Sequence, residues 1–187
     1  MLWEKCDEGC REAGKPTGTP KLLQIHVSWA RTDEDAIATA VARFHLRDCA
    51  RAAADSPWGS PEKVWQPVAQ NFLHIAPHLT EPADRQQLDA LQRWSAAEHA
   101  RLAPLMAARK RDGFIRECHG DLHLGNLAWV DDQLLVFDCL EFNPELRWID
   151  ILSEVAFCTM DLMQRGHRDL AWLFLNLWLE KTGDYEG

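Results

Sequence analysis

The stretch CHGDLHLGNLAWVDDQLLVFD, residues 118–138, decides how this sequence folds. Its second half holds two short apolar runs, LAWV and LLVF, joined across Asp131 and Asp132, a pattern typical of a β-hairpin. Its first half is a loop that leads into the hairpin. The polar side chains of that loop are His119, Asp121, His123 and Asn126. The sequence therefore predicts a small hairpin that carries a loop with the side chains of a catalytic or metal site.

Apolar residues recur at helical spacing on both sides of this stretch. A first helix is predicted from Thr32, and a second from Ser60 as its N-cap with Pro61 in the first turn. A third is expected from residue 81 or 82 towards 110, with Pro104 kinking or interrupting it. The run FIREC predicts a short strand before the loop, and two further helices are expected after the hairpin.

The inward faces of these helices follow from the same spacing. The second helix is expected to bury Val64, Val68, Phe72 and Ile75. The third is expected to bury Leu88, Leu91, Trp94, Leu102 and Leu105. The last two are expected to bury Ile149, Leu152, Val155, Ala156 and Met160, then Leu170, Leu173 and Leu177. The predicted fold class is α+β and mainly α.

Residues 1–31 form the least regular part of the chain, because glycines and prolines interrupt them and no period survives. Within them LLQIHVSW, residues 22–29, is at most one strand. We therefore predict a poorly defined N-terminal segment over 1–31 and one helical lobe over 32–187.

Composition excludes several classes of protein. The net charge of −9 lacks the clustered lysines and arginines of a nucleic-acid binder, and no apolar run approaches the roughly 20 residues of a membrane span. Six cysteines without a secretion signal or a regular framework predict reduced thiols in a cytoplasmic protein. Cys6 and Cys10 lack the partner pair that a zinc site needs.

The polar residues of the loop suit phosphoryl transfer from ATP. Asn126 and Asp138 offer hard oxygen ligands, which suit Mg²⁺, and Asp121 is placed to accept a proton. The spacing of His119, Asp121 and Asn126 fits the kinase catalytic loop H-x-D-x-x-x-x-N, and Asp138 follows after one hairpin, as a metal-binding aspartate should. This reaction demands positioning and charge neutralisation more than covalent chemistry.

HGDLHLGN followed by VFD resembles the aminoglycoside phosphotransferase and choline kinase group of protein-kinase-like enzymes. The stretches FDCLEFNPELRWIDILSEVAFCTMDL and SPWGSPEKVWQPVAQNF are similar to a bacterial branch often fused to a P-loop ATPase domain. The resemblance covers roughly residues 40–187. It implies the C-terminal, large lobe of a protein-kinase-like fold that transfers the γ-phosphate of ATP to a small-molecule hydroxyl.

The resemblance also implies roles for individual residues. Asp121 would be the catalytic base, His119 would brace the loop, and His123 would reach the transferring phosphate or the acceptor. Asn126 and Asp138 would hold Mg²⁺ against the nucleotide. The remaining implied residues are Glu141, an extra acid near the metal, and Asp150, an anchor for the backbone of the catalytic loop.

Other interpretations of the same residues stay open. Taken alone, His119 could have a purely structural role. The charge of Asp138 at the edge of the core could be compensated by Arg147 rather than by a metal. His119, Asp121 and His123 also match H-x-D-x-H, a transition-metal set of a hydrolase. That set leaves Asn126 and Asp138 without a role.

A complete kinase-like enzyme has an N-terminal lobe with a glycine-rich loop and a strand lysine. The sequence contains neither G-x-G-x-x-G nor a V-A-I-K-like strand. The expected partners are therefore a missing N-terminal lobe or a fused ATPase domain, besides the small-molecule acceptor. The alternative is a non-catalytic remnant or binding module.

Overall fold

The computed structural model describes residues 2–3, 21–22, 31–130 and 133–187. The chain divides into two compact units, one formed by residues up to 51 together with 116–187, the other by 52–115. Helices dominate both, and short strands occur beside the candidate loop. The predicted α+β, mainly helical class is confirmed, while the division at residue 31 stays a prediction.

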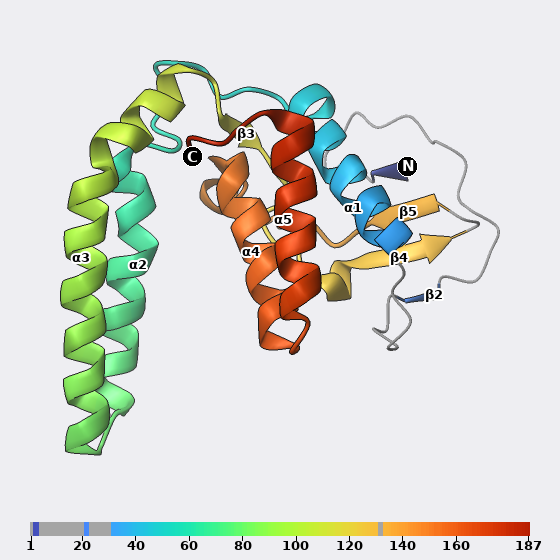
Figure 1. Cartoon of the computed structure of the whole chain (residues 1–187). Coiled ribbons are helices and arrows are strands. Elements are labelled where there is room, and N and C mark those ends of the chain that lie inside the picture. The colour runs from blue at the N-terminus through green and yellow to red at the C-terminus, as the bar shows by residue number, and fades with distance from the viewer. Residues whose placement is uncertain (1, 4–20, 23–30, 131–132) are drawn as a thin grey trace. The chain divides into compact units, whose positions relative to one another are not determined.

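Three helices form the core of the first unit. They are α1 (Arg31–Arg43), α4 (Ile151–Gln164) and α5 (Arg168–Thr182), and α5 packs against both α1 and α4 (Figure 1). Their buried side chains include Ile37, Val41, Val155, Leu162, Phe174 and Trp178. Each such residue contributes about 1.5–3 kcal/mol when it leaves water, so this core supplies a rigid support for the loop.

The predicted hairpin is confirmed as β4 (Leu127–Val130) and β5 (Gln133–Val136), which pair antiparallel with Leu127 opposite Val136. Two short strands extend the sheet: β1 (Leu2–Trp3) lies parallel to β5, and β2 (Lys21–Leu22) lies antiparallel to β4. The predicted turn at Asp131 and Asp132, and most of the stretch 22–29, lie outside the described residues.

A second, two-stranded sheet pairs β3 (Ile115–Glu117) with β6 (Trp148–Asp150). The strand predicted from FIREC is confirmed as β3. Ile149 was predicted to belong to a helix, and this was wrong: it lies in β6. The helix begins at Ile151 because the Asp150 carboxylate caps it, accepting a hydrogen bond from the Leu152 N–H at 2.9 Å.

The second unit is a pair of helices, α2 (Pro61–Ile75) and α3 (Pro82–Arg111). Ser60 caps α2 as predicted, because its side chain accepts from the Lys63 N–H at 3.3 Å. The third predicted helix is confirmed, but it runs through Pro104 without interruption. The predicted interruption at Pro104 does not occur, because the missing N–H removes only one hydrogen bond of a long helix. The alternative, a kink at Pro104, stays a prediction.

Several residues predicted to face inward are exposed. On α3, Leu91 is 52%, Trp94 63% and Leu105 37% exposed, and on α2 Ile75 is 44% exposed. The physical reason is that a two-helix unit covers only one narrow stripe of each helix, so a wider apolar face remains in water. Met160 on α4 is 47% exposed because the buried stripe runs through Ile151, Val155, Cys158 and Leu162.

Candidate active site

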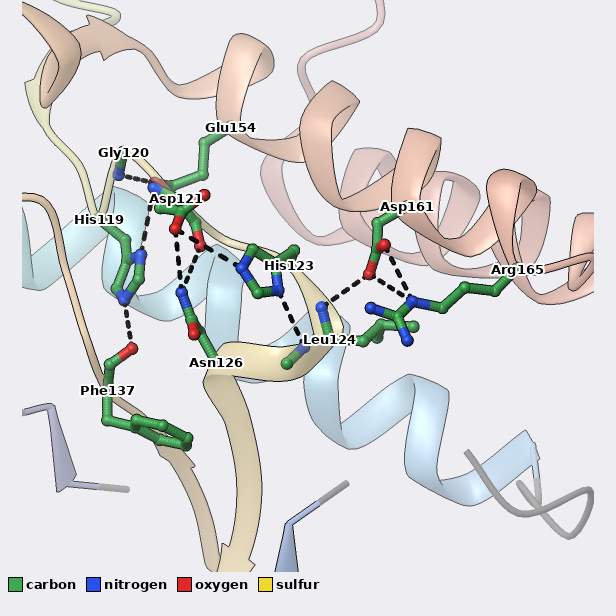
Figure 2. Close-up of polar contacts among 11 residues, drawn as sticks. His119, Gly120, Asp121, His123, Leu124, Asn126, Phe137, Glu154, Asp161 and Arg165 are labelled. Carbon is green, nitrogen blue, oxygen red and sulfur yellow. Dashed lines mark hydrogen bonds and ion pairs between the residues drawn. The ribbon is translucent and has the colours of Figure 1, made fainter. Parts of the chain in front are cut away.

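The polar loop begins after β3 and ends at β4, and His119 holds it in place (Figure 2). The His119 Nε2–H donates to the Phe137 carbonyl at 2.8 Å, and its Nδ1 accepts from the Asp121 N–H at 3.3 Å. A carbonyl only accepts and a backbone N–H only donates, so these two partners require the neutral ring with its proton on Nε2. A bracing role of His119 would use these two hydrogen bonds, and the role itself stays a prediction.

These contacts also bear on the hydrolase interpretation. His119 is 3% exposed, and both of its ring nitrogens are engaged with backbone groups. A histidine that ligates a metal needs one nitrogen for the ion. The geometry therefore disfavours a metal set made of His119, Asp121 and His123.

Gly120 lets the backbone turn sharply at the base of the loop. Its φ is +84°, a conformation that side-chain-bearing residues rarely adopt. A Cβ at this position would lie 2.7 Å from the Leu146 carbonyl oxygen. Glycine is therefore required both by the backbone angle and by the close approach of the neighbouring chain.

Asp121 and Asn126 lie side by side at the mouth of the loop (Figure 2). The Asn126 Nδ2 donates to the Asp121 carbonyl oxygen at 3.0 Å and to its carboxylate Oδ2 at 3.3 Å. Asn126 is buried, whereas the Asp121 side chain is 35% exposed. A carboxylate held by an amide and open to solvent is able to meet an acceptor hydroxyl.

His123 flanks the same carboxylate. Its Nε2 lies 3.5 Å from the Asp121 Oδ2, and its Nδ1 accepts from the Gly125 N–H at 3.0 Å. The ring meets Phe157 edge-on, with 6.4 Å between centroids. Because Nδ1 accepts, the proton of the neutral ring is on Nε2, where it faces Asp121.

Asp138 lies two residues after the end of β5 in a strained backbone conformation. Its φ is +62°, and among the described residues other than glycine it is the one with positive φ. Aspartate tolerates this region better than most residues, and such outliers cluster at functional sites. The side chain is exposed, two residues after the buried Val136. Arg147, the alternative partner predicted for Asp138, forms an ion pair with Glu117 at 2.8 Å. Its compensation of the Asp138 charge stays a prediction.

Two backbone bonds tie Asp138 to the loop. The Phe137 N–H donates to the Asn126 carbonyl at 3.1 Å, and the Leu140 N–H donates to the His119 carbonyl at 3.1 Å. Together with the His119 ring they flank Asp138 on both sides along the chain. The structure thus brings the loop carrying Asp121 and Asn126 next to the segment carrying Asp138.

The resemblance also implies roles for Glu141 and Asp150. Glu141 is exposed, three residues beyond Asp138. Asp150 caps α4. The Gly120 N–H donates to the Glu154 Oε1 at 2.7 Å (Figure 2). The metal role of Glu141 and the anchoring role of Asp150 stay predictions.

Sequence reasoning missed two acids on α4 that hold the loop. Glu154 accepts from Gly120, and the Asp161 Oδ2 accepts from the Leu124 N–H at 3.0 Å while pairing with Arg165 (Figure 2). Glu154 follows Ile151 by three and precedes Cys158 by four, so it falls on the buried stripe. A charged residue on an apolar stripe was the signal that could have found it, because buried charges require partners.

The cysteines differ from the prediction of six reduced thiols. Cys49, Cys118 and Cys158 are buried thiols, but Cys139 is disulfide-bonded. Burial raises the pKa of Cys118 well above its ordinary value, helped by a hydrogen bond with Cys49 and by the nearby Glu154. The thiolate is the reactive form, so this sulfur is not a nucleophile at neutral pH.

The oxygens of the site fit a magnesium ion. Because the Asn126 Nδ2 donates to Asp121, its Oδ1 is the atom that the amide offers to a cation. The exposed Asp138 carboxylate would be a second hard ligand. Mg²⁺ usually takes one or two protein ligands and completes its shell with water and phosphates, so this donor set suits a nucleotide-bound ion.

Across the described ranges, no helix is both long and apolar enough to cross a membrane.

No known family model matches the chain. It is 30% identical over 152 residues to uncharacterized proteins of Mycobacterium tuberculosis (strain ATCC 25618 / H37Rv) and Mycobacterium bovis (strain ATCC BAA-935 / AF2122/97). The match covers 80% of this chain. The chain spans only 30% of the length of these relatives.

Among solved structures, the chain is similar to a glucosamine kinase in complex with glucosamine, ADP and inorganic phosphate. The TM-score is 0.50 at 19% identity, covering 85% of this chain and 44% of that one. A second glucosamine kinase structure, crystal form B, has a TM-score of 0.49 at 18% identity, covering 81% of this chain and 40% of the other. At 19% identity, the similarity to the glucosamine complex concerns the fold alone.

This comparison corrects the predicted family. The solved structure to which the chain is similar in fold is a glucosamine kinase, so the assignment to the aminoglycoside phosphotransferase and choline kinase group was wrong, and its protein-kinase-like lobe is not confirmed. The physical reason is that HGDLHLGN constrains one short loop. Loop chemistry does not specify the arrangement of the surrounding helices, which decides the structural neighbours.

Proposed function

We propose that this chain carries the catalytic loop of an ATP-dependent phosphotransferase, which transfers the γ-phosphate to a hydroxyl of a small molecule. One observation carries the proposal. Asp121 and Asn126 are hydrogen-bonded to each other on a loop that is tied by backbone bonds to the segment bearing an exposed, strained Asp138.

In this proposal Asp121 accepts the proton of the acceptor hydroxyl as the new oxygen–phosphorus bond forms and the bond between the γ-phosphorus and the β–γ bridging oxygen of ATP breaks, with ADP leaving. Asn126 keeps the Asp121 carboxylate oriented through its Nδ2 and offers Oδ1 to the cation. Asp138 supplies the second cation ligand. Magnesium, when bound, neutralises the charge of the phosphates. The His123 Nε2–H faces Asp121 and is placed to donate to a phosphate oxygen.

The acceptor class proposed is a sugar, and an amino sugar in particular. The support is a likeness of fold to a glucosamine kinase whose structure holds glucosamine, ADP and inorganic phosphate. A net charge of −9 agrees with a cationic acceptor. The chain spans 30% of the length of its curated relatives, so the activity of the whole protein is part of this proposal. We also propose a cytoplasmic location.

The proposal is tested by incubating the chain with Mg²⁺, ATP and a panel of sugars and amino sugars, with ³¹P NMR to detect a sugar phosphate. Asp121→Asn should abolish transfer while Asp89→Asn, an exposed aspartate on α3, should leave it unchanged. Glu141→Gln tests whether that acid is a further ligand. A folded wild-type chain that forms neither sugar phosphate nor ADP would refute the proposal and favour a binding module.

A further inference from the structure

A buried polar cluster lies behind the loop, where α1 and α5 meet α4. The His45 Nε2 lies 2.7 Å from the Glu154 Oε2, and the Trp178 Nε1 lies 3.2 Å from the His45 Nδ1. The other carboxylate oxygen of Glu154 accepts the Gly120 N–H at 2.7 Å. His45, Glu154 and Trp178 are at most 1% exposed, so water does not supply alternative partners.

The partners fix the protonation state of this cluster. An indole N–H only donates, so the Trp178 Nε1 makes the His45 Nδ1 an acceptor. A neutral imidazole then carries its proton on Nε2, from which it donates to Glu154. Both Glu154 oxygens therefore accept hydrogen bonds, which is the arrangement of an ionised carboxylate.

The same argument speaks against a metal. The ligand atoms of His45, Cys118 and Glu154 lie within 4.8 Å of one another and resemble a ligand set. A metal on the His45 Nε2 would move the ring proton to Nδ1, where it would face the Trp178 N–H. Two donors would then oppose each other in a dry interior, at a high cost.

We propose that His45, Glu154 and Trp178 form a tautomer-locked relay that positions the catalytic loop through the Gly120 amide. Trp178 sets the tautomer of His45, His45 orients one oxygen of Glu154, and the other oxygen fixes the residue before Asp121. His45 and Glu154 are thus positioning residues. The consequence for Asp121 rests on the proposed function, but the state of His45 does not.

The local backbone supports a specific role for His45. It lies in a π-helical turn, Phe44–Asp48, that follows α1. Such turns are rare and frequent at functional sites. Arg116, next to the loop in sequence, donates to the His45 carbonyl. Backbone and side chain of His45 are therefore both held.

Glutamine is the informative replacement for Glu154. It keeps the shape of glutamate but has one acceptor and one donor end. If its oxygen faces Gly120, its NH₂ faces the His45 Nε2–H, and Trp178 prevents the ring from moving that proton away. Glu154→Gln should therefore loosen the Gly120 amide, and Trp178→Phe added to it should partly restore the contact by freeing His45 to change tautomer.

The first experiment is ¹⁵N NMR of the full chain with labelled histidine, using the signal lost in His45→Gln for assignment. The proposal predicts a neutral His45 with its proton on Nε2, unchanged on addition of Zn²⁺. A signal of the Nδ1–H form, of imidazolium, or one shifted by Zn²⁺ would overturn it. This result does not depend on nucleotide binding.

The second experiment measures hydrogen exchange of the Gly120 amide in the wild type, Glu154→Gln, Trp178→Phe and the double variant. Exchange should accelerate about tenfold or more in Glu154→Gln, and the double variant should exchange more slowly than Glu154→Gln alone. Two additive accelerations would indicate mere loss of packing and overturn the relay. Thermal melts confirm that each variant is folded.

The two proposals fail separately. If the wild-type chain transfers no phosphate but His45 has the stated tautomer and the double variant restores Gly120 protection, the phosphotransferase proposal fails and the relay stands. If the chain is active, Glu154→Gln should lower kcat at an unchanged KM for ATP. An active Glu154→Gln with wild-type kcat would overturn the positioning role.

Discussion

The His119 Nε2–H donates to the backbone carbonyl of Phe137 at 2.8 Å, which joins the polar loop to the residue that precedes Asp138. The His119 carbonyl accepts from Leu140 on the other side of Asp138. One residue thus holds both ends of the segment that carries the proposed cation ligand. The relative position of Asp121 and Asp138 depends on this connection.

His119→Ala should therefore lower the free energy of unfolding by about 2 kcal/mol, because it leaves a buried carbonyl and a backbone N–H without their partner. Urea denaturation measures the change. His74→Ala, an exposed histidine on α2, should change it by less than about 0.5 kcal/mol. Equal effects of the two variants would show that the ring of His119 does not brace the loop.

Gly120 and Gly166 provide a matched pair of backbone tests. Their φ angles are +84° and +85°, but only at Gly120 would a Cβ meet a backbone atom, the Leu146 oxygen at 2.7 Å. Gly166→Ala should cost about 1–2 kcal/mol from the angle alone. Gly120→Ala should cost at least about 1 kcal/mol more from overlap. Thermal melts of both variants give the comparison, and similar costs would contradict the close approach.

The left-handed backbone conformation of Asp138 should lower the stability of the fold. Asp138→Gly and Asp138→Ala both remove the carboxylate, but only glycine adopts a φ of +62° without strain. The glycine variant should be more stable than the alanine variant by about 1 kcal/mol in chemical denaturation. If alanine is tolerated as well as glycine, the left-handed conformation is not present in solution.

The buried Cys118 thiol should make stability depend on alkaline pH. Burial raises its pKa well above 9.0 in the folded chain, so the unfolded chain releases this proton first. The free energy of unfolding then falls as pH rises above 9.0, and stability is complete below that value. The Cys118→Ala variant has no thiol at this position and so lacks this pH dependence of its unfolding free energy. The stability difference between wild type and variant should therefore shrink from about pH 8 to about pH 10. A constant difference would contradict burial of the thiol.

Much of the site could be predicted from the spacing of a few residues. The hairpin and the loop holding His119, Asp121 and Asn126 follow from a change of hydrophobic period and from turn chemistry, which are local properties of the chain. The capping of α2 by Ser60 is local in the same way. Local patterns could not predict the contact of Glu154 with Gly120, because the two residues lie 34 positions apart in the sequence.

The errors have a common origin in tertiary context. Leu91 and Trp94 satisfy the helical period, yet they are exposed because only one helix covers α3 within its unit. Asp138 follows the apolar run LLVF, and local patterns did not predict its positive φ or its exposure. The predicted family failed for a related reason, because a loop motif does not encode the packing of helices.

The most direct test of the central claim is a calorimetric titration of the chain with ATP, with Mg²⁺ and with EDTA. Wild type and Asp89→Asn should bind ATP in a magnesium-dependent manner, and Asp138→Asn should lose that dependence, since asparagine tolerates the left-handed backbone but lacks the charge. A folded wild type that binds no ATP, or an Asp138→Asn variant that binds as the wild type does, would contradict the account.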